Sequence, residues 1–196
     1  MSVVEFVGLA AAVLTVVAYV PYIKAIKGGQ VKPHFFSWLI WTLTTAIVFL
    51  AQLAADGGAG AWPTAVSAAI TVYVAWLALV LRSDFTNTRA DWCFLIAALL
   101  SLPAWFITAD PLWSVIILTL VDALGFGPTL RKAWQKPQEE SMQFYLLFAV
   151  RSGLSIYALE SRTLTTVLFP AAMVVACVLV CGMLWWRRRE RSSTTS

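Results

Sequence analysis

The chain has 196 residues, of which 60% are hydrophobic and only 12% are charged, and its mean hydropathy is +0.79. Soluble globular domains carry roughly a quarter charged residues, so this composition excludes a water-soluble domain and indicates a protein that lies in a lipid bilayer. The formal net charge of +4 reflects basic residues that stand beside apolar segments. They favour contact with lipid headgroups, and we expect no nucleic-acid partner.

Seven apolar segments are long enough, or nearly so, to cross a hydrocarbon layer about 30 Å thick as helices. They are predicted at residues 3–26, 35–55, 62–81, 92–109, 112–134, 141–159 and 164–186. The first segment lacks the basic start and the short apolar core of a cleavable signal, so we expect it to be retained. The predicted fold class is an all-α membrane protein with seven transmembrane helices.

An internal repeat relates the first three segments to the last three. Pro21 and Pro128 are 107 positions apart (128 − 21), and Pro63 and Pro170 have the same separation (170 − 63). Two matches at one spacing predict a duplicated three-helix unit, and a single linker helix between two such units makes them parallel. The predicted parts are a first repeat at residues 1–82, a linker helix at 83–110, a second repeat at 111–187 and a basic cytoplasmic tail at 188–196.

Basic residues are distributed unequally between alternate loops. Twelve of them lie in the first, third and fifth loops and the C-terminal tail, whereas Arg162 stands alone in the alternate loops. Cytoplasmic loops of membrane proteins are enriched in Lys and Arg. We therefore predict a multi-pass protein of the cell (inner) membrane with its N-terminus outside and its C-terminus in the cytoplasm.

Proline stands near the cytoplasmic end of the first predicted helix of each repeat. Pro21 precedes a basic turn in the first repeat, and Gly125, Gly127 and Pro128 precede one in the second. Proline and closely spaced glycines are common causes of helix kinks. These four residues are therefore the predicted hinges of a cytoplasmic gate.

Aromatic and hydroxyl side chains recur along the second segment. Trp38, Trp41, Thr42 and Thr45 have helical spacing and are predicted to share one stripe. An indole surface beside hydroxyl groups suits a pocket for a sugar ring or a flat heterocycle. An interfacial aromatic belt combined with helix packing would produce the same pattern, and the sequence leaves both interpretations open.

The second repeat carries two ionisable residues well inside predicted spans, Asp122 and Arg151. A charge in the bilayer centre costs at least about 2.5 to 3.5 kcal/mol, so each is expected to face the interior and to pair with the other. The pair either joins two helices as a structural element or lines a substrate path. Gln143 and Ser155 are predicted to share the polar stripe of Arg151. The predicted substrate-binding set is Trp38, Trp41, Thr42, Thr45, Asp122, Gln143, Arg151 and Ser155.

Motifs of soluble-enzyme chemistry do not occur in the sequence. There is no HExxH, Walker or GxGxxG motif, and the single histidine, His34, is expected to be a loop or cap residue at a helix start. We therefore expect a protein that is not an enzyme, with no catalytic residue, cofactor or metal site.

The predicted layout and two short motifs resemble the PQ-loop, SWEET and MtN3-like superfamily of seven-helix transporters. Pro21-Tyr22 and Pro128-Thr129 stand where that superfamily has its Pro-Gln pair, and each precedes a basic loop that ends in a serine. The resemblance implies two parallel three-helix units, joined by a linker helix, that alternate in access around a central site. It implies a sugar, a nucleoside-like or vitamin-like compound, or an amino acid as the substrate, the last with proton coupling through an acidic residue such as Asp122.

The expected function is therefore transport of a small polar organic solute by alternating access. The alternative is a receptor of the same seven-helix fold that binds a ligand or cargo without moving it across the membrane. The expected partners are a small-molecule substrate and the lipid bilayer, and a homo-oligomer is compatible with the sequence.

Overall fold

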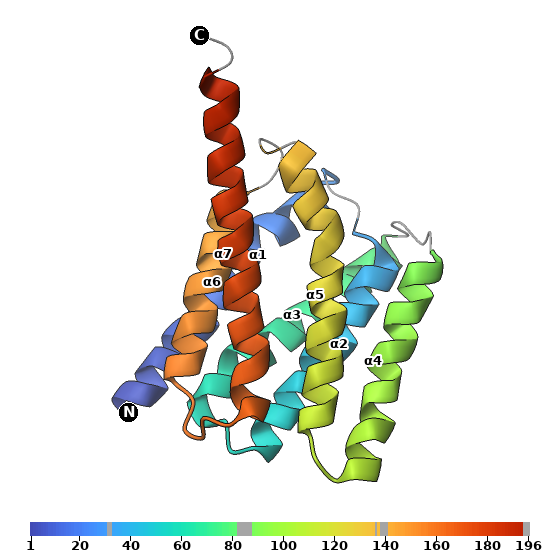
Figure 1. Cartoon of the computed structure of the whole chain (residues 1–196), viewed down its shortest axis with the longest axis vertical. Helices are drawn as coiled ribbons and strands as arrows, with labels where there is room; N and C mark the ends of the chain where they lie inside the picture. The colour runs from blue at the N-terminus through green and yellow to red at the C-terminus, as the bar shows by residue number, and fades with distance from the viewer. Residues whose placement is uncertain (31–32, 82–87, 136, 138–140, 194–196) are drawn as a thin grey trace.

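The computed structural model describes the backbone of residues 1–30, 33–81, 88–135, 137 and 141–193, and the side chains of all of these except 126–129, 131–133 and 191–193. Its regular secondary structure is helical. The helices are α1 (Val3–Lys27), α2 (Phe35–Ala54), the 3-10 helix η1 (Gly58–Ala61), α3 (Trp62–Val80), α4 (Arg89–Thr108), α5 (Leu112–Gln135), α6 (Met142–Tyr157) and α7 (Leu164–Ser193) (Figure 1). Each α-helix begins within three residues of its predicted start.

Capping side chains explain where several helices begin. Ser2 and Glu5 form a capping box on α1, and Thr88 and Asp91 form another on α4. At the start of α2, Nδ1 of His34 accepts a hydrogen bond from the backbone N–H three residues later. Such caps satisfy N–H groups that the first turn of a helix leaves unbonded. The prediction of His34 as a cap residue is confirmed.

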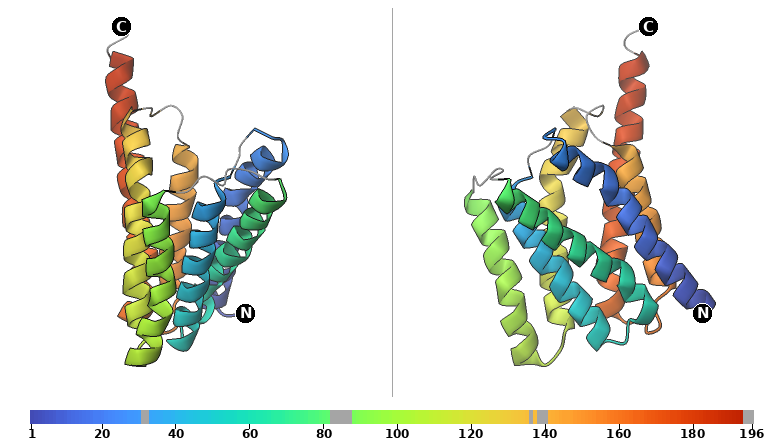
Figure 2. Two further views of the ribbon diagram at one scale, coloured as in Figure 1. Left: turned by 90° about the vertical axis from the view of Figure 1, so that its right-hand side faces the viewer. Right: turned by 180° about the vertical axis from the view of Figure 1, so that it is seen from behind.

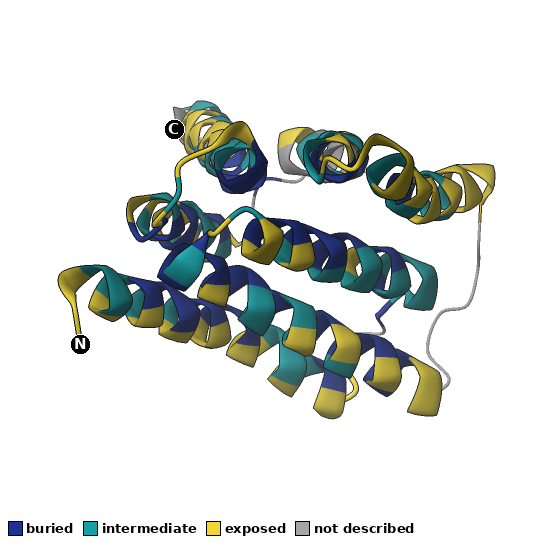
Figure 3. Ribbon diagram, turned by 90° about the horizontal axis from the view of Figure 1, so that it is seen from below, coloured by how far each residue is buried: buried dark blue, intermediate teal, exposed yellow. Residues whose placement is uncertain are grey.

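Five of the described helical segments are long and apolar enough to cross a membrane: Val3–Lys27, Phe35–Ala54, Gly58–Val80, Arg89–Thr108 and Leu164–Glu190. The described apolar part of α5, Leu112–Gly125, is shorter, and α6 has 16 residues. Many large apolar residues are exposed, among them Phe106 at 82% and Ile107 at 84%. Exposed residues lie along the outer faces of the helices (Figure 3). Such an apolar exterior favours lipid as the surroundings of the bundle.

Six of the described helices form a closed ring. Around the ring the packing order is α1, α3, α2, α5, α7, α6 and back to α1, while α4 lies outside the ring against α5 and α2 (Figure 3). Successive helices alternate in direction, so the N-terminus and the C-terminus lie at opposite ends of the bundle (Figures 1 and 2). We refer to these as the N-terminal end and the C-terminal end.

The N-terminal end is closed by tight packing of η1 between α1 and α6. Ser155 Oγ of α6 donates a hydrogen bond to the Gly60 carbonyl at 2.6 Å, and Gln52 Nε2 of α2 donates to the Thr166 carbonyl of α7 at 3.2 Å. A Cβ atom at Gly60 would lie only 2.7 Å from the Ser155 carbonyl oxygen and 2.7 Å from the Leu159 nitrogen. Glycine is therefore required for this approach of η1 to α6.

Gly60→Ala is expected to lower the melting temperature by at least about 2 °C, since overpacking costs about 1 to 3 kcal/mol and 1 kcal/mol corresponds to about 2 to 4 °C in a domain of this size. The matched control is Gly153→Ala, because a Cβ at that position in α6 would meet nothing within 4 Å. The control should unfold at the wild-type temperature or slightly above it. Thermal unfolding of the detergent-solubilised protein measures both, and equal melting temperatures for the two variants would contradict the close packing.

Three helices continue beyond their predicted end points, α1 and α5 by one residue each and α7 by seven. α1 runs through Pro21 to Lys27, because a proline inside a helix removes a single backbone hydrogen bond and such losses are tolerated in membrane helices. α7 continues past residue 186 to Ser193, so the basic tail predicted at residues 188–196 begins as helix.

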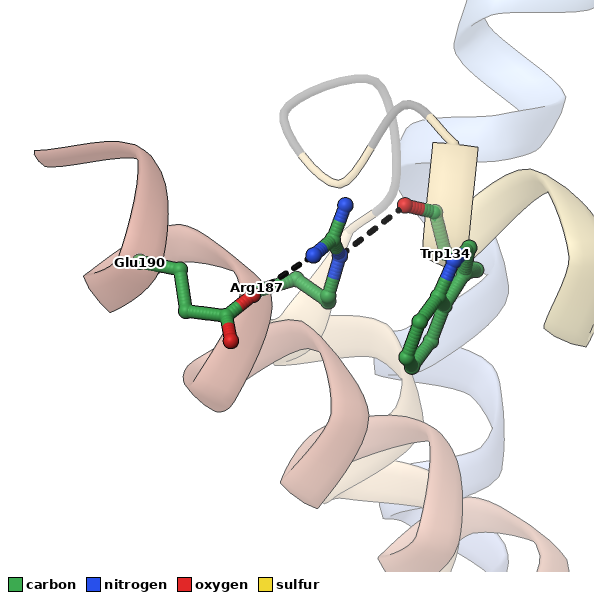
Figure 4. Close-up of polar contacts among 3 residues, drawn as sticks. All are labelled: Trp134, Arg187 and Glu190. Carbon is green, nitrogen blue, oxygen red and sulfur yellow. Dashed lines mark hydrogen bonds and ion pairs between the residues drawn. The ribbon is translucent and has the colours of Figure 1, made fainter. Parts of the chain in front are cut away.

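Contacts with the end of α5 explain why α7 extends so far. Arg187 Nε donates to the Trp134 carbonyl at 3.3 Å, and its guanidinium carbon lies 4.6 Å from the centroid of the Trp134 ring (Figure 4). Arg187 also forms an ion pair with Glu190 at 2.5 Å, and Arg188 donates two hydrogen bonds to the Pro137 carbonyl. The arginines thus bind the backbone at the end of α5 and the turn after it.

Candidate functional site

Two ionisable residues, Asp122 and Arg151, lie in the interior of the ring. They are only 7% and 5% exposed. α5 positions Asp122 where this helix packs against α2, and α6 positions Arg151 where this helix packs near α1 and α3. Buried charges are normally paired or coordinated. The contacts of each side chain therefore determine what the site can bind.

Arg151 is held by uncharged groups. Its Nη1 atom donates to the Pro63 carbonyl and to Ser67 Oγ, both at 3.2 Å, and its guanidinium carbon lies 4.6 Å from the centroid of the Phe148 ring. Its Nε atom is buried and has no hydrogen-bond partner. Arg151 therefore joins α6 to the start of α3, while its positive charge is not neutralised by a carboxylate.

Asp122 has fewer partners than Arg151. Its Oδ1 atom is buried and lacks a hydrogen-bond partner, and so does the hydroxyl of Thr119 one turn earlier in α5. A polar neighbour of the carboxylate is the hydroxyl of Thr44 in α2, which itself donates to the Trp41 carbonyl at 3.1 Å. An acceptor oxygen without a donor in the interior has a large desolvation cost, so Asp122 is poised to bind a positively charged or hydrogen-bond-donating group.

The predicted pairing of Asp122 with Arg151 is wrong. In the part of the chain that the structure describes, no ion pair joins the two side chains. The reason is the order in which the helices pack. Helix α7 lies between α5 and α6, so these two helices do not face each other. Asp122 lies where α5 packs against α2, and Arg151 contacts α3 instead. The structural interpretation of these residues as a bridge between the fifth and sixth helices is therefore excluded.

Tyr19 of α1 lies in the interior near Arg151. The ring of Tyr19 is buried and lies 5.4 Å from the Phe148 ring and 6.3 Å from the Trp38 ring, measured between centroids. The same Phe148 ring is 4.6 Å from the Arg151 guanidinium carbon. Aromatic side chains of α1, α2 and α6 therefore stand beside Arg151 in the interior of the ring.

The predicted internal repeat pairs each of these residues with a threonine. The spacing of 107 positions relates Asp122 to Thr15 (122 − 107) and Arg151 to Thr44 (151 − 107). Both threonines are fully buried. Positions of α1, α2, α5 and α6 that the predicted repeat makes equivalent carry two threonines and two charges, which we call the interior polar set: Thr15, Thr44, Asp122 and Arg151. Sequence reasoning missed Thr15, Thr44 and Tyr19, although the repeat spacing was sufficient to find the first two.

The predicted aromatic stripe on α2 divides into buried and exposed parts. Trp38 and Thr45 are buried, Thr42 is partly buried and Trp41 is 38% exposed. The hydroxyl of Thr42 donates to the Trp38 carbonyl at 2.8 Å, and that of Thr45 donates to the Trp41 carbonyl at 2.6 Å. Since both hydroxyls are bonded within their own helix, they are not free donors at the edge of a pocket.

Trp38 belongs to an aromatic group that packs between α2 and α1. It lies 5.2 Å from the Tyr22 ring and 5.0 Å from the Trp41 ring, and the Thr45 and Thr71 hydroxyls are 3.2 Å apart. This side of α2 faces α1 and α3. The α2 residue that approaches Asp122 is Thr44, which was not in the predicted set.

The predicted polar stripe on α6 is not formed. Gln143 is exposed, whereas Arg151 and Ser155 are buried. Eight residues advance a helix by about 80° more than two full turns, which places Gln143 on another face of α6. Ser155 is held at the N-terminal end by its hydrogen bond to Gly60.

The predicted hinge residues occupy different surroundings. Pro21 is exposed within α1, and a Cβ at Gly125 would meet no atom within 4 Å. The predicted hinge residues Gly127 and Pro128 lie outside the residues whose side chains the structure describes. The hinge role of all four residues stays a prediction.

The chemistry that this site supports is recognition of charge. Within the described residues, no group of three or more His, Cys, Asp or Glu side chains could hold a metal ion. The interior instead presents a carboxylate and a guanidinium that are not paired with each other, together with unbonded hydroxyls at Thr119 and Ser152. No family model, curated protein or solved structure matches the chain.

Proposed function

We propose that the protein transports a small polar organic solute by alternating access between two three-helix units, α1–α3 and α5–α7, with α4 as the linker. The observation that carries the proposal is the burial of Asp122 and Arg151 without an ion pair between them. Each charge costs at least about 2.5 to 3.5 kcal/mol in the middle of a bilayer. Charges retained at that cost without mutual neutralisation favour a binding role over a structural one.

The packing order supports the division into two units. In the first unit α3 packs against both α1 and α2, and in the second α7 packs against both α5 and α6. The units meet where α1 packs against α6 and where α5 packs against α2. Exchange of the two units converts one junction into the other, as a two-fold relation between parallel repeats requires. The proposed site lies between these junctions, where the interior polar set is found.

The distribution of basic residues supports the proposed orientation. Lys24, Lys27 and Arg187 lie at the C-terminal end of the bundle, and Arg162 lies at the N-terminal end. In our proposal α5 and α6 complete seven spans of the cell (inner) membrane, with the N-terminal end outside and the C-terminal end in the cytoplasm. The resemblance to the PQ-loop and SWEET superfamily leads to the same arrangement.

The tight N-terminal end favours a conformation that is closed toward the outside. Backbone hydrogen bonds from Glu160 to the Gly57 carbonyl and from Ser161 to the Asp56 carbonyl join the two units there. In this proposal these bonds must break for the site to open outward, and Asp122 is our candidate for a proton-binding group that links transport to protons.

Uptake into proteoliposomes tests the proposal. The purified protein is reconstituted and offered radiolabelled sugars, nucleosides, vitamins and amino acids, with empty liposomes as the control. We expect saturable uptake of one class that is accelerated by unlabelled solute trapped inside. Binding of a solute without any uptake would contradict transport and would support the receptor alternative.

A further inference from the structure

We propose that the substrate is a zwitterion, which places its ammonium group at Asp122 and its carboxylate or other anionic group at Arg151. This inference rests on the proposed function and defines the class of solute that the interior accepts.

The Asp122 side of the site fits an ammonium group. The carboxylate presents an unbonded oxygen, the hydroxyl of Thr44 lies beside it, and Thr119 adds an unbonded hydroxyl one turn away on α5. Carboxylate and hydroxyl oxygens are acceptors that a three-donor ammonium group can use together. No arginine, lysine or histidine forms an ion pair with Asp122 among the described residues.

The Arg151 side fits an anion. Nη1 is fixed by the Pro63 carbonyl and Ser67 Oγ, which orient the guanidinium group but leave its charge uncompensated. Nε keeps an unbonded N–H, and the neighbouring Ser152 hydroxyl is also buried without a partner. A carboxylate can accept hydrogen bonds from such donors, and charge-assisted bonds of this kind are the strong ones.

One ligand is expected to bind both sides, because Asp122 and Arg151 are both buried within the same six-helix ring. Asp122 stands at the junction of α5 with α2, and Arg151 stands on α6, which forms the other junction with α1. A solute with a single charge would leave the second buried charge uncompensated, whereas a zwitterion neutralises both. A neutral sugar has less support as the substrate, because it would leave both buried charges uncompensated.

Thermal unfolding with matched ligands tests the inference. The purified full-length protein is heated with the standard amino acids, β-alanine, γ-aminobutyrate and ε-aminocaproate, and with butylamine and butyrate as single-charge analogues of γ-aminobutyrate. We expect at least one zwitterion to raise the melting temperature by about 3 °C or more, whereas its amine and acid analogues at the same concentration have little effect.

Two variants then assign the charges. Asp122→Asn should lose stabilisation by the zwitterion and gain a preference for the acid analogue, and Arg151→Gln should gain a preference for the amine analogue. Asp56→Asn, an exposed substitution in the turn after α2, should bind like the wild type. Equal stabilisation of the wild type by the amine alone or by the acid alone would overturn the assignment.

Uptake assays separate this inference from the proposed function. Transport of a neutral sugar or nucleoside, with no zwitterion binding, would refute the zwitterion and leave the transporter in place. Binding of a zwitterion without uptake would confirm the ligand class and refute transport. Uptake of the zwitterion that stabilises the protein would support both.

Discussion

Asp122→Asn is expected to reduce uptake at least about 30-fold, because removal of one partner of a buried charge interaction costs about 2 to 5 kcal/mol. The folded protein should not suffer, since Oδ1 of Asp122 is buried without a hydrogen-bond partner and its neutral replacement carries a smaller desolvation cost. The melting temperature without ligand should therefore equal or exceed that of the wild type. Initial uptake rates in proteoliposomes and thermal unfolding in detergent measure the two effects.

The control for this variant is Asp56→Asn. Asp56 is exposed, and its left-handed backbone, with a φ of 54°, is one that asparagine tolerates. The hydrogen bond that its carbonyl accepts from the Ser161 N–H is between backbone atoms, so the substitution leaves it in place. Its uptake should match the wild type. Full uptake by a well-folded Asp122→Asn protein would show that the carboxylate takes no part in transport.

Arg151→Gln is expected to lower both uptake and stability. The substitution removes hydrogen bonds to the Pro63 carbonyl and Ser67 Oγ, which join α6 to α3. Hydrogen bonds from charged groups contribute about 1.5 to 3 kcal/mol each, so the melting temperature should fall by about 5 °C or more. Uptake should fall at least about tenfold, because the variant loses the charge that faces the substrate in our proposal.

The double variant tests the absence of an ion pair. If Asp122 and Arg151 do not contact each other, the stability changes of the two substitutions should add within about 0.5 kcal/mol. A strongly non-additive result would show that the residues are paired after all. Arg162→Gln is the control for loss of a positive charge, since this exposed arginine bonds only the Tyr157 carbonyl at the N-terminal end among its described contacts, and it should behave like the wild type.

The helices themselves were predictable because apolar length and capping chemistry are local properties. The start of α2 follows from Pro33 and His34, and the start of α7 follows from the apolar run after Thr163. The end of α7 was not predictable, because its extension depends on contacts between Arg187 and the distant Trp134. Long-range contacts of this kind leave no local pattern.

The charged residues of the site were found from sequence, but their partners were not. Depth along a helix is available from residue number, so Asp122 and Arg151 stood out as buried charges. Their directions depend on which helices pack together, and the order in which α7 separates α5 from α6 cannot be read from spacing alone. The same limit applies to α2, where Thr42 was predicted to face the site and Thr44 faces Asp122 instead.

Gln143 shows how small angular errors accumulate. Over four residues, from Arg151 to Ser155, a helix position drifts by about 40°, and both residues are buried. Over the eight residues from Gln143 to Arg151 the drift doubles, and Gln143 becomes exposed. Polar spacing therefore predicts a common face reliably only over one or two turns.

The continuous α7 offers a practical route to experimental imaging. Its last two turns project past the end of α5 and are anchored there by Arg187 and Arg188 (Figures 1 and 4). A soluble marker domain whose first helix is fused in frame to this rod would be held at a fixed angle, because no flexible joint separates the two. Electron cryomicroscopy of such a fusion would supply the particle mass and the alignment signal that a bundle of 21.6 kDa lacks by itself.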